Sequence, residues 1–102
     1  MAHAHPDLTD ELLAPIRADL HAERRARSAA LANGVAREER VVAEQFLADI
    51  TAAIARIEQG QFGICDACST PIEMMRLEAL PTTRFCIGCA ADPPARPPAG
   101  VP

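Results

Sequence analysis

The chain has 102 residues and a formal net charge of −4, and its only aromatic side chains are three Phe. So few large apolar groups cannot fill a large core, and small domains of this kind usually depend on a disulfide or a bound metal. The acidic balance argues against a chain coated with nucleic acid, and no apolar run reaches the roughly 18 residues of a membrane span. The first residues lack the cationic and apolar stretches of a signal peptide, so we expect a cytoplasmic protein.

The composition divides the chain into four segments. Residues 1–8 are polar and predict a disordered, frayed tail. Residues 9–59 are rich in helix formers and predict a helical hairpin with its turn at Asn-Gly, near residues 33–34. Residues 60–91 hold all four cysteines. In residues 92–102, five of the eleven residues are Pro, which predicts an extended, unpacked tail.

Apolar residues recur every three or four positions in both halves of 9–59, as they do on one face of a helix. Two such helices joined at a tight break predict an antiparallel coiled-coil hairpin, although one long broken helix or two helices of a bundle fit the same pattern. Pro15 would sit inside a helix that starts at Thr9, and we favour a continuous, kinked helix over one that begins at Pro15. The two stripes are Leu8, Leu12, Leu13, Ile16 and Leu20, then Val42, Phe46, Ile50, Ala53 and Ile57.

The cysteines form two Cys-x-x-Cys pairs, Cys65 with Cys68 and Cys86 with Cys89, and 17 residues separate the pairs. This spacing is typical of a zinc site, because each pair makes a tight turn and two turns can place four sulfurs at about 2.3 Å from one ion. Four protein ligands leave no open position, so the predicted Zn²⁺ is structural rather than catalytic.

Other uses of these thiols have less support. A thioredoxin-like redox pair needs a βαβ setting, a disulfide framework needs an oxidising compartment, and an iron–sulfur cluster would use the same ligands. No other group of residues supports catalysis, so we expect no enzyme. The sequence therefore predicts a mostly α fold: an antiparallel helical hairpin with a small four-cysteine zinc finger at its base.

The residues around the cysteines follow a longer pattern. Gly-Gln-Phe-Gly at 60–63 precedes Cys65, and the pairs are separated by Pro71-Ile72, Arg-Leu-Glu-Ala at 76–79 and Pro81. This pattern resembles the DksA/TraR family of C4-type zinc finger proteins. The resemblance implies that the four cysteines bind zinc and that the finger stabilises the base of the hairpin. It also implies a bacterial transcription regulator that binds RNA polymerase, often together with the alarmone ppGpp, and does not itself read a DNA sequence.

The turn of the hairpin departs from that family's pattern. The family's best-studied tip carries acids in an Asp-x-x-Asp-x-Ala pattern, whereas residues 32–36 read Ala-Asn-Gly-Val-Ala. Residues 24–40 contain five arginines and two glutamates, so this stretch has a net charge of +3. A cationic tip is repelled by catalytic Mg²⁺ and attracted to phosphates or acidic protein surfaces. The candidate partner-binding residues are Arg24, Arg25, Arg27, Arg37 and Arg40.

Three functions fit these features. The first is a zinc-binding transcription regulator that acts through RNA polymerase, and the resemblance favours it. The second is a hairpin module that binds another protein partner. The third is weak, salt-sensitive and non-specific nucleic-acid binding through the Arg-rich tip, for which a solvated helix surface is the simpler interpretation.

Overall fold

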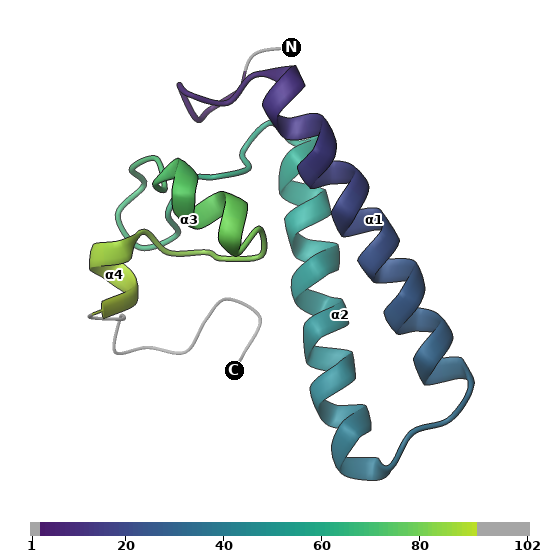
Figure 1. Ribbon diagram of the computed structural model, residues 1–102. Helices are drawn as coiled ribbons and strands as arrows, with labels where there is room; N and C mark the ends of the chain where they lie inside the picture. Colours follow the sequence, from purple (N-terminus) through teal and green to yellow (C-terminus); the bar gives the residue numbers. More distant parts are fainter. Residues whose placement is uncertain (1–2, 92–102) are drawn as a thin grey trace.

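The computed structural model describes residues 3–91 and confirms the predicted fold class (Figure 1). Helices α1 (Asp10–Ala32) and α2 (Arg37–Glu58) form the antiparallel hairpin. The finger follows and contains the short helices α3 (Met74–Ala79) and α4 (Ile87–Ala91). Figure 1 shows the finger beside α2, while the closed end of the hairpin projects away from it. The Pro-rich segment predicted to be a disordered tail, 92–102, lies outside the described residues.

Helix α1 begins where the sequence provides a cap. The Thr9 hydroxyl accepts a hydrogen bond from the Leu12 amide at 3.2 Å, and two acids occupy the first turn. Both features satisfy or complement the exposed amides of a helix N-terminus. Pro15 lies inside the helix, so the continuous helix favoured from the sequence is the one observed.

Among residues 3–91, no helix combines the length and the apolar character that a membrane span requires.

The hairpin turns at Asn33 and Gly34. The Asn33 amide donates to the Ala29 carbonyl at 3.0 Å and closes α1, and Gly34 follows with φ +91°. That left-handed conformation costs glycine little and other residues more. Helix α2 then starts at Arg37.

One core is shared by the hairpin and the finger. Leu13, Ile16 and Leu20 of α1 pack with the buried face of α2, and Phe62, Ile72 and Leu77 of the finger complete the same cluster. The core therefore fills the base half of the hairpin. The α2 residues in it are Ile50, Ala53, Ile54 and Ile57.

The apolar stripes are only partly buried. Val42 and Phe46 belong to the predicted stripe of the second arm but remain 55% and 47% exposed, and Leu12 at the base of the first arm is 45% exposed on the side away from the core. Near the tip only two helices pack together, so one side of each has no neighbour. Burial there stops where the finger stops covering α2.

The N-terminal segment differs from the frayed tail predicted over 1–8. Residues 3–8 pack against the finger: His5 and Leu8 are 1% and 5% exposed, and the Ala4 amide donates to the Gly60 carbonyl at 2.9 Å. Local composition could not predict this, because the carbonyl that His5 binds belongs to Ile72, 67 residues away in the sequence. A polar segment is ordered here by partners that only the folded chain supplies.

Candidate metal centre

Two turns of different construction carry the cysteine pairs. The first pair lies in the turn between Ile64 and Pro71, which form a short antiparallel bridge, and the Cys65 amide donates to the Thr70 carbonyl at 2.9 Å. Within this turn Ser69 adopts φ 62° and donates its amide to the Cys65 carbonyl. The second pair lies at the start of α4, where Cys86 directly precedes the helix.

The four sulfurs converge on one point, as predicted for Cys65, Cys68, Cys86 and Cys89. All four Sγ atoms lie within 4.8 Å of one another, and the Cys68 and Cys86 sulfurs are 3.8 Å apart. A tetrahedron with zinc–sulfur bonds of about 2.3 Å has edges of about 3.8 Å. The cluster therefore fits one tetrahedral metal ion and leaves no open position for a substrate.

The thiols differ in acidity because their surroundings differ. Burial raises the pKa of the Cys65 thiol, but hydrogen bonds from backbone amides, foremost that of Cys86, outweigh it and bring the pKa to about 6. The Thr70 hydroxyl, 2.9 Å from the Cys68 sulfur, lowers the pKa of Cys68. The neighbouring cysteines, first Cys86, raise the pKa of Cys89 to about 12. Four thiolates this close need a cation between them, which a divalent metal supplies.

Side chains around the cluster hold the two turns together. Arg84 donates to the Asp66 carboxylate at 2.7 Å, and Arg76 donates to the Phe85 carbonyl at 2.8 Å. The Glu73 carboxylate accepts a hydrogen bond from the Ile87 amide at 3.1 Å. Hydrogen bonds from the backbone amide of Glu73 and, to a smaller extent, from that of Ile87 lower the pKa of the Glu73 carboxyl group. Sequence reasoning did not identify these supports, because each bond joins residues 9 to 18 positions apart.

His5 connects the N-terminal segment to the finger. The Asp7 amide donates to its Nδ1 at 3.1 Å, so Nε2 carries the proton and donates to the Ile72 carbonyl at 2.7 Å. The ring also lies against Gly63, where an added Cβ would come within 2.9 Å of His5 Cδ2. The glycine after the aromatic in the family pattern thus leaves room for this imidazole.

Arg56 lies at the junction of α2 and the finger. Its Nη2 atom is buried and has no hydrogen-bond partner among the described residues. Burial lowers the pKa of Arg56, while the Asp66 carboxylate opposes that shift. Asp66 is thus paired with Arg84 and lies close enough to Arg56 for its charge to act on that guanidinium.

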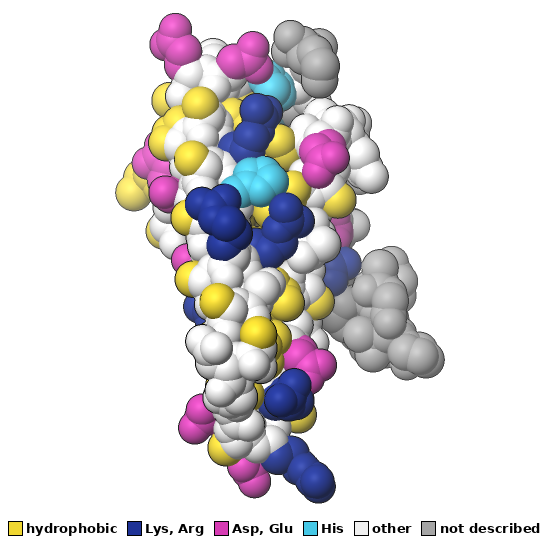
Figure 2. Space-filling model, turned by 90° about the vertical axis from the view of Figure 1, so that its right-hand side faces the viewer, with side chains coloured by type: hydrophobic (Ala, Val, Ile, Leu, Met, Phe, Trp, Pro, Cys, Tyr) yellow, Lys and Arg dark blue, Asp and Glu magenta, His cyan; other side chains and the backbone are white. Residues whose placement is uncertain are grey.

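The five arginines proposed for partner binding do not form one free cluster. Arg27 donates twice to Glu23, at 2.9 and 3.1 Å, and its guanidinium lies 4.6 Å from the centre of the Phe46 ring. The Nη2 atom of Arg24 lies 3.3 Å from Nδ1 of His21. Within residues 3–91, Arg25, Arg37 and Arg40 are exposed and make no ion pair. Figure 2 shows basic side chains both midway along the hairpin and at its lower end.

The match to a known family falls on this region. Residues 60–93 match the prokaryotic dksA/traR C4-type zinc finger. This segment is a DksA/TraR-type finger. The resemblance noted in the sequence is thereby confirmed, and the four cysteines of the DksA/TraR-type finger are positioned to bind one zinc ion.

Beyond the finger, most of the chain resembles solved structures of Dks proteins. The RNA polymerase binding protein and transcriptional regulator Dks from Chlamydia trachomatis L2 aligns with a TM-score of 0.66 at 25% identity, over 83% of this chain and 90% of that one. Transcription factor DksA2 from Pseudomonas aeruginosa aligns with a TM-score of 0.53 at 23% identity, over 80% and 77% of the two chains. The second likeness shows a shared fold alone.

Curated relatives match over a shorter stretch. The RNA polymerase-binding transcription factor DksA of Haemophilus influenzae is 42% identical over 40 residues, which are 39% of this chain and 28% of that protein. An uncharacterized protein of Aquifex aeolicus is 44% identical over 46 residues, which are 45% and 32% of the two chains. The matched stretch thus spans less than a third of either relative.

Proposed function

We propose that this chain is a zinc-binding, non-enzymatic regulator that binds RNA polymerase in the bacterial cytoplasm. The correspondence with the chlamydial Dks protein carries the proposal, because it extends over both the hairpin and the finger. The curated relatives named as polymerase-binding factors support it over the matched stretch. In this function the zinc is structural and the hairpin is the part presented to the partner.

The exposed arginines at the far end of the hairpin are the proposed contact. Arg25, Arg37 and Arg40 remain available to a partner, whereas Arg27 stabilises the packing of α1 against α2. Arginines bind phosphates and carboxylates in a planar, two-pronged geometry. We therefore propose an acidic or phosphate-bearing surface as the partner's side of the contact. In the proposed function the protein does not bind a specific DNA sequence.

Retention of the host's RNA polymerase by the immobilised protein tests the function. We expect retention at low and at moderate salt, because a specific interface does not depend on screened charges alone. Arg25→Glu should weaken retention roughly tenfold, the effect of losing about 1.4 kcal/mol of binding free energy. Arg17→Glu is the matched control, since both arginines are exposed on α1 and lie eight residues apart.

The same assay separates the alternatives. Equal loss in both variants would contradict the tip as the contact, and no retention of polymerase by the unaltered protein would contradict the function. Binding of a labelled oligonucleotide of arbitrary sequence, lost steeply with salt, would instead favour nucleic acid at the tip. Adding ppGpp to the polymerase assay tests whether that anion takes part, as the family resemblance implied.

A further inference from the structure

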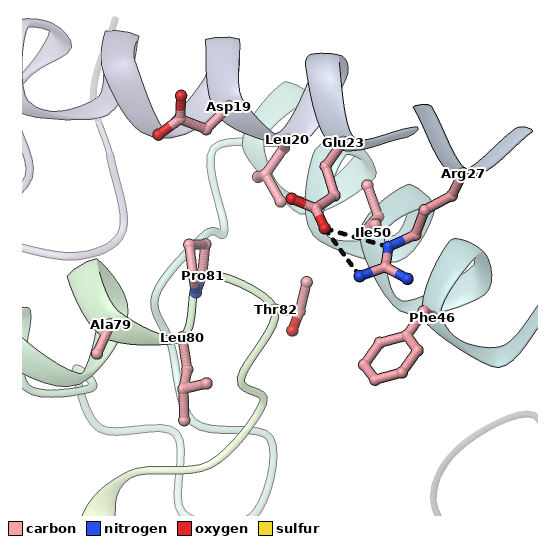
Figure 3. A pocket seen from close by; sticks show the side chains of 10 residues that line it. All are labelled: Asp19, Leu20, Glu23, Arg27, Phe46, Ile50, Ala79, Leu80, Pro81 and Thr82. Atoms are coloured by element: carbon pink, nitrogen blue, oxygen red, sulfur yellow. Dashed lines mark hydrogen bonds and ion pairs between the residues drawn. The ribbon is translucent and has the colours of Figure 1, made fainter. Parts of the chain in front are cut away.

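An open cleft separates the hairpin from the finger (Figure 3). Leu20, Phe46 and Ile50 form its hairpin wall, and the turn from Ala79 to Thr82 forms the finger wall. The cleft is mainly apolar, and Phe46 and Leu80 at its sides are 47% and 52% exposed. Large apolar groups left half-exposed across a cleft from one another indicate a place for another apolar segment.

The rim of this cleft carries one unpaired acid. Glu23 is held by Arg27, whose guanidinium covers one face of the Phe46 ring. Asp19 also lines the cleft, is exposed, and makes no ion pair among residues 3–91. The chemistry of the cleft therefore fits an apolar segment that carries a single positive charge.

We propose that residues 92–102 of this chain bind in the cleft, with prolines against Phe46 and Leu80 and Arg96 beside Asp19. Prolines in extended segments bind grooves lined by aromatic side chains, because the segment loses little conformational entropy on binding. Arg96 is the single basic residue of the segment and stands between Pro93-Pro94 and Pro97-Pro98. Its charge complements Asp19 as the flanking prolines complement the apolar walls.

The segment is long enough to reach the cleft. The backbone from Thr82 to Ile87 spans at most about 18 Å, and α4 adds about 6 Å, so Ala91 lies within about 24 Å of the finger wall. Eleven residues in a polyproline conformation extend about 34 Å. Because the segment is joined to the finger, its effective concentration at the cleft is far above that of a separate chain.

Nuclear Overhauser effects in the full, zinc-loaded chain test this proposal. The chain has three Phe and neither Tyr nor Trp, so the ring protons of Phe46 can be resolved. We expect effects between the Phe46 ring and proline protons of residues 92–102, and none from the buried ring of Phe62, which serves as the internal control. No such effect at Phe46 would overturn the proposal.

Charge exchange tests the ion pair. Arg96→Glu should remove the effects at Phe46, and adding Asp19→Arg to that variant should restore them. Glu44→Arg is the matched control, because Glu44 is exposed on α2 and does not line this cleft. The pairing would be overturned if the effects at Phe46 persisted in Arg96→Glu. It would also be overturned if adding Glu44→Arg to that variant restored them as well as Asp19→Arg does.

A mixture of labelled and unlabelled chains identifies the source of the segment. Effects seen only within one chain support the proposal, and effects between chains would overturn it in favour of a second copy. The experiment contains no polymerase, so its outcome is separate from that of the proposed function.

Discussion

His5 uses both ring nitrogens to join the N-terminal segment to the finger. Its Nδ1 accepts from Asp7, its Nε2 donates to Ile72, and the ring is 1% exposed. Loss of the ring would leave a buried carbonyl and an amide without partners and open a cavity beside Gly63. Each of these effects costs free energy in a packed interior.

His5→Ala should therefore lower the free energy of unfolding by about 2 to 3 kcal/mol, the sum of a lost buried hydrogen bond and a cavity. Urea unfolding of the zinc-loaded protein, followed by circular dichroism, measures the change. His21→Ala is the control: its ring lies on α1 and contacts Arg24, and we expect a loss below about 0.5 kcal/mol. Similar losses in the two variants would show that His5 is not a special support.

Substituting Gly63 and Gly34 by Ala distinguishes the backbone cost of an added methyl group from its packing cost. Gly63 has φ +86°, and a Cβ there would lie 2.9 Å from His5 Cδ2 and 3.0 Å from Leu77 Cδ1. Gly34 has φ +91° but nothing within 4 Å of its Cβ position. Gly63→Ala should destabilise the protein by the left-handed backbone cost of about 1 kcal/mol plus a packing cost of about 1 to 3 kcal/mol. Gly34→Ala should show the first cost alone, and equal thermal midpoints for the two variants would contradict the crowding at Gly63.

The cysteines could be predicted from the sequence, whereas the residues that support them could not. The cysteine spacing predicted that the four sulfurs converge, because each Cys-x-x-Cys pair forms a local turn. The role of His5 and the support from Glu73 depend on partners 67 and 14 residues away. Residue type alone identified Arg27 as a candidate contact, whereas its ion pair with Glu23 follows from helical spacing.

At the scale of elements, the finger has little structure of its own beyond two short helices and one bridge. Its helices have six and five residues, too few to be stable alone in water. The order of this segment must come from the metal and from contact with the hairpin. Removal of the metal should therefore unfold the finger and, through the core that the two parts share, destabilise the hairpin helices.

Cys68→Ser tests this dependence with little direct effect on packing, because Cys68 is exposed. We expect the variant to lose its stoichiometric zinc and to melt at a lower temperature, as the unaltered protein should in the presence of a chelator. Ala67→Ser is the control, since it places the same hydroxyl in the same turn and leaves four ligands. One zinc per chain in Cys68→Ser would contradict the four-cysteine site.

The apolar periodicity predicted both arms of the hairpin but not the limit of their burial. Ile50 and Ile57 are buried in the core that the hairpin shares with the finger, whereas Val42 and Phe46 continue the same stripe and are half-exposed. A helical period reports which face is apolar and not how far a neighbour extends along it. The position of the finger decides that, and it depends on tertiary contacts.

At the scale of the whole molecule, the hairpin and the finger are joined through a common core. Leu13 of α1, Ile54 of α2 and Leu77 of the finger belong to one buried cluster. Neither part can lose its packing without exposing apolar surface of the other. Such coupling favours a single cooperative unfolding transition.

Cobalt substitution can measure this coupling, because Co²⁺ bound by four thiolates absorbs visible light and reports on the finger. Helix content at 222 nm reports mainly on α1 and α2. In the cobalt-loaded protein we expect the two signals to change with the same thermal midpoint. Loss of the cobalt band well below the helix transition would show that the hairpin is stable by itself.

The bond between His5 and Ile72 also sets an order for folding during synthesis. The backbone hydrogen bonds of α1 and α2 lie within residues 10–58, so both helices can begin to form while the finger is still being made, but their core lacks Phe62, Ile72 and Leu77 until then. His5 leaves the ribosome before its acceptor, because Ile72 is added 67 residues later. The N-terminal segment must wait beside a hairpin whose core is incomplete, and it can dock only when the finger part of that core has been made.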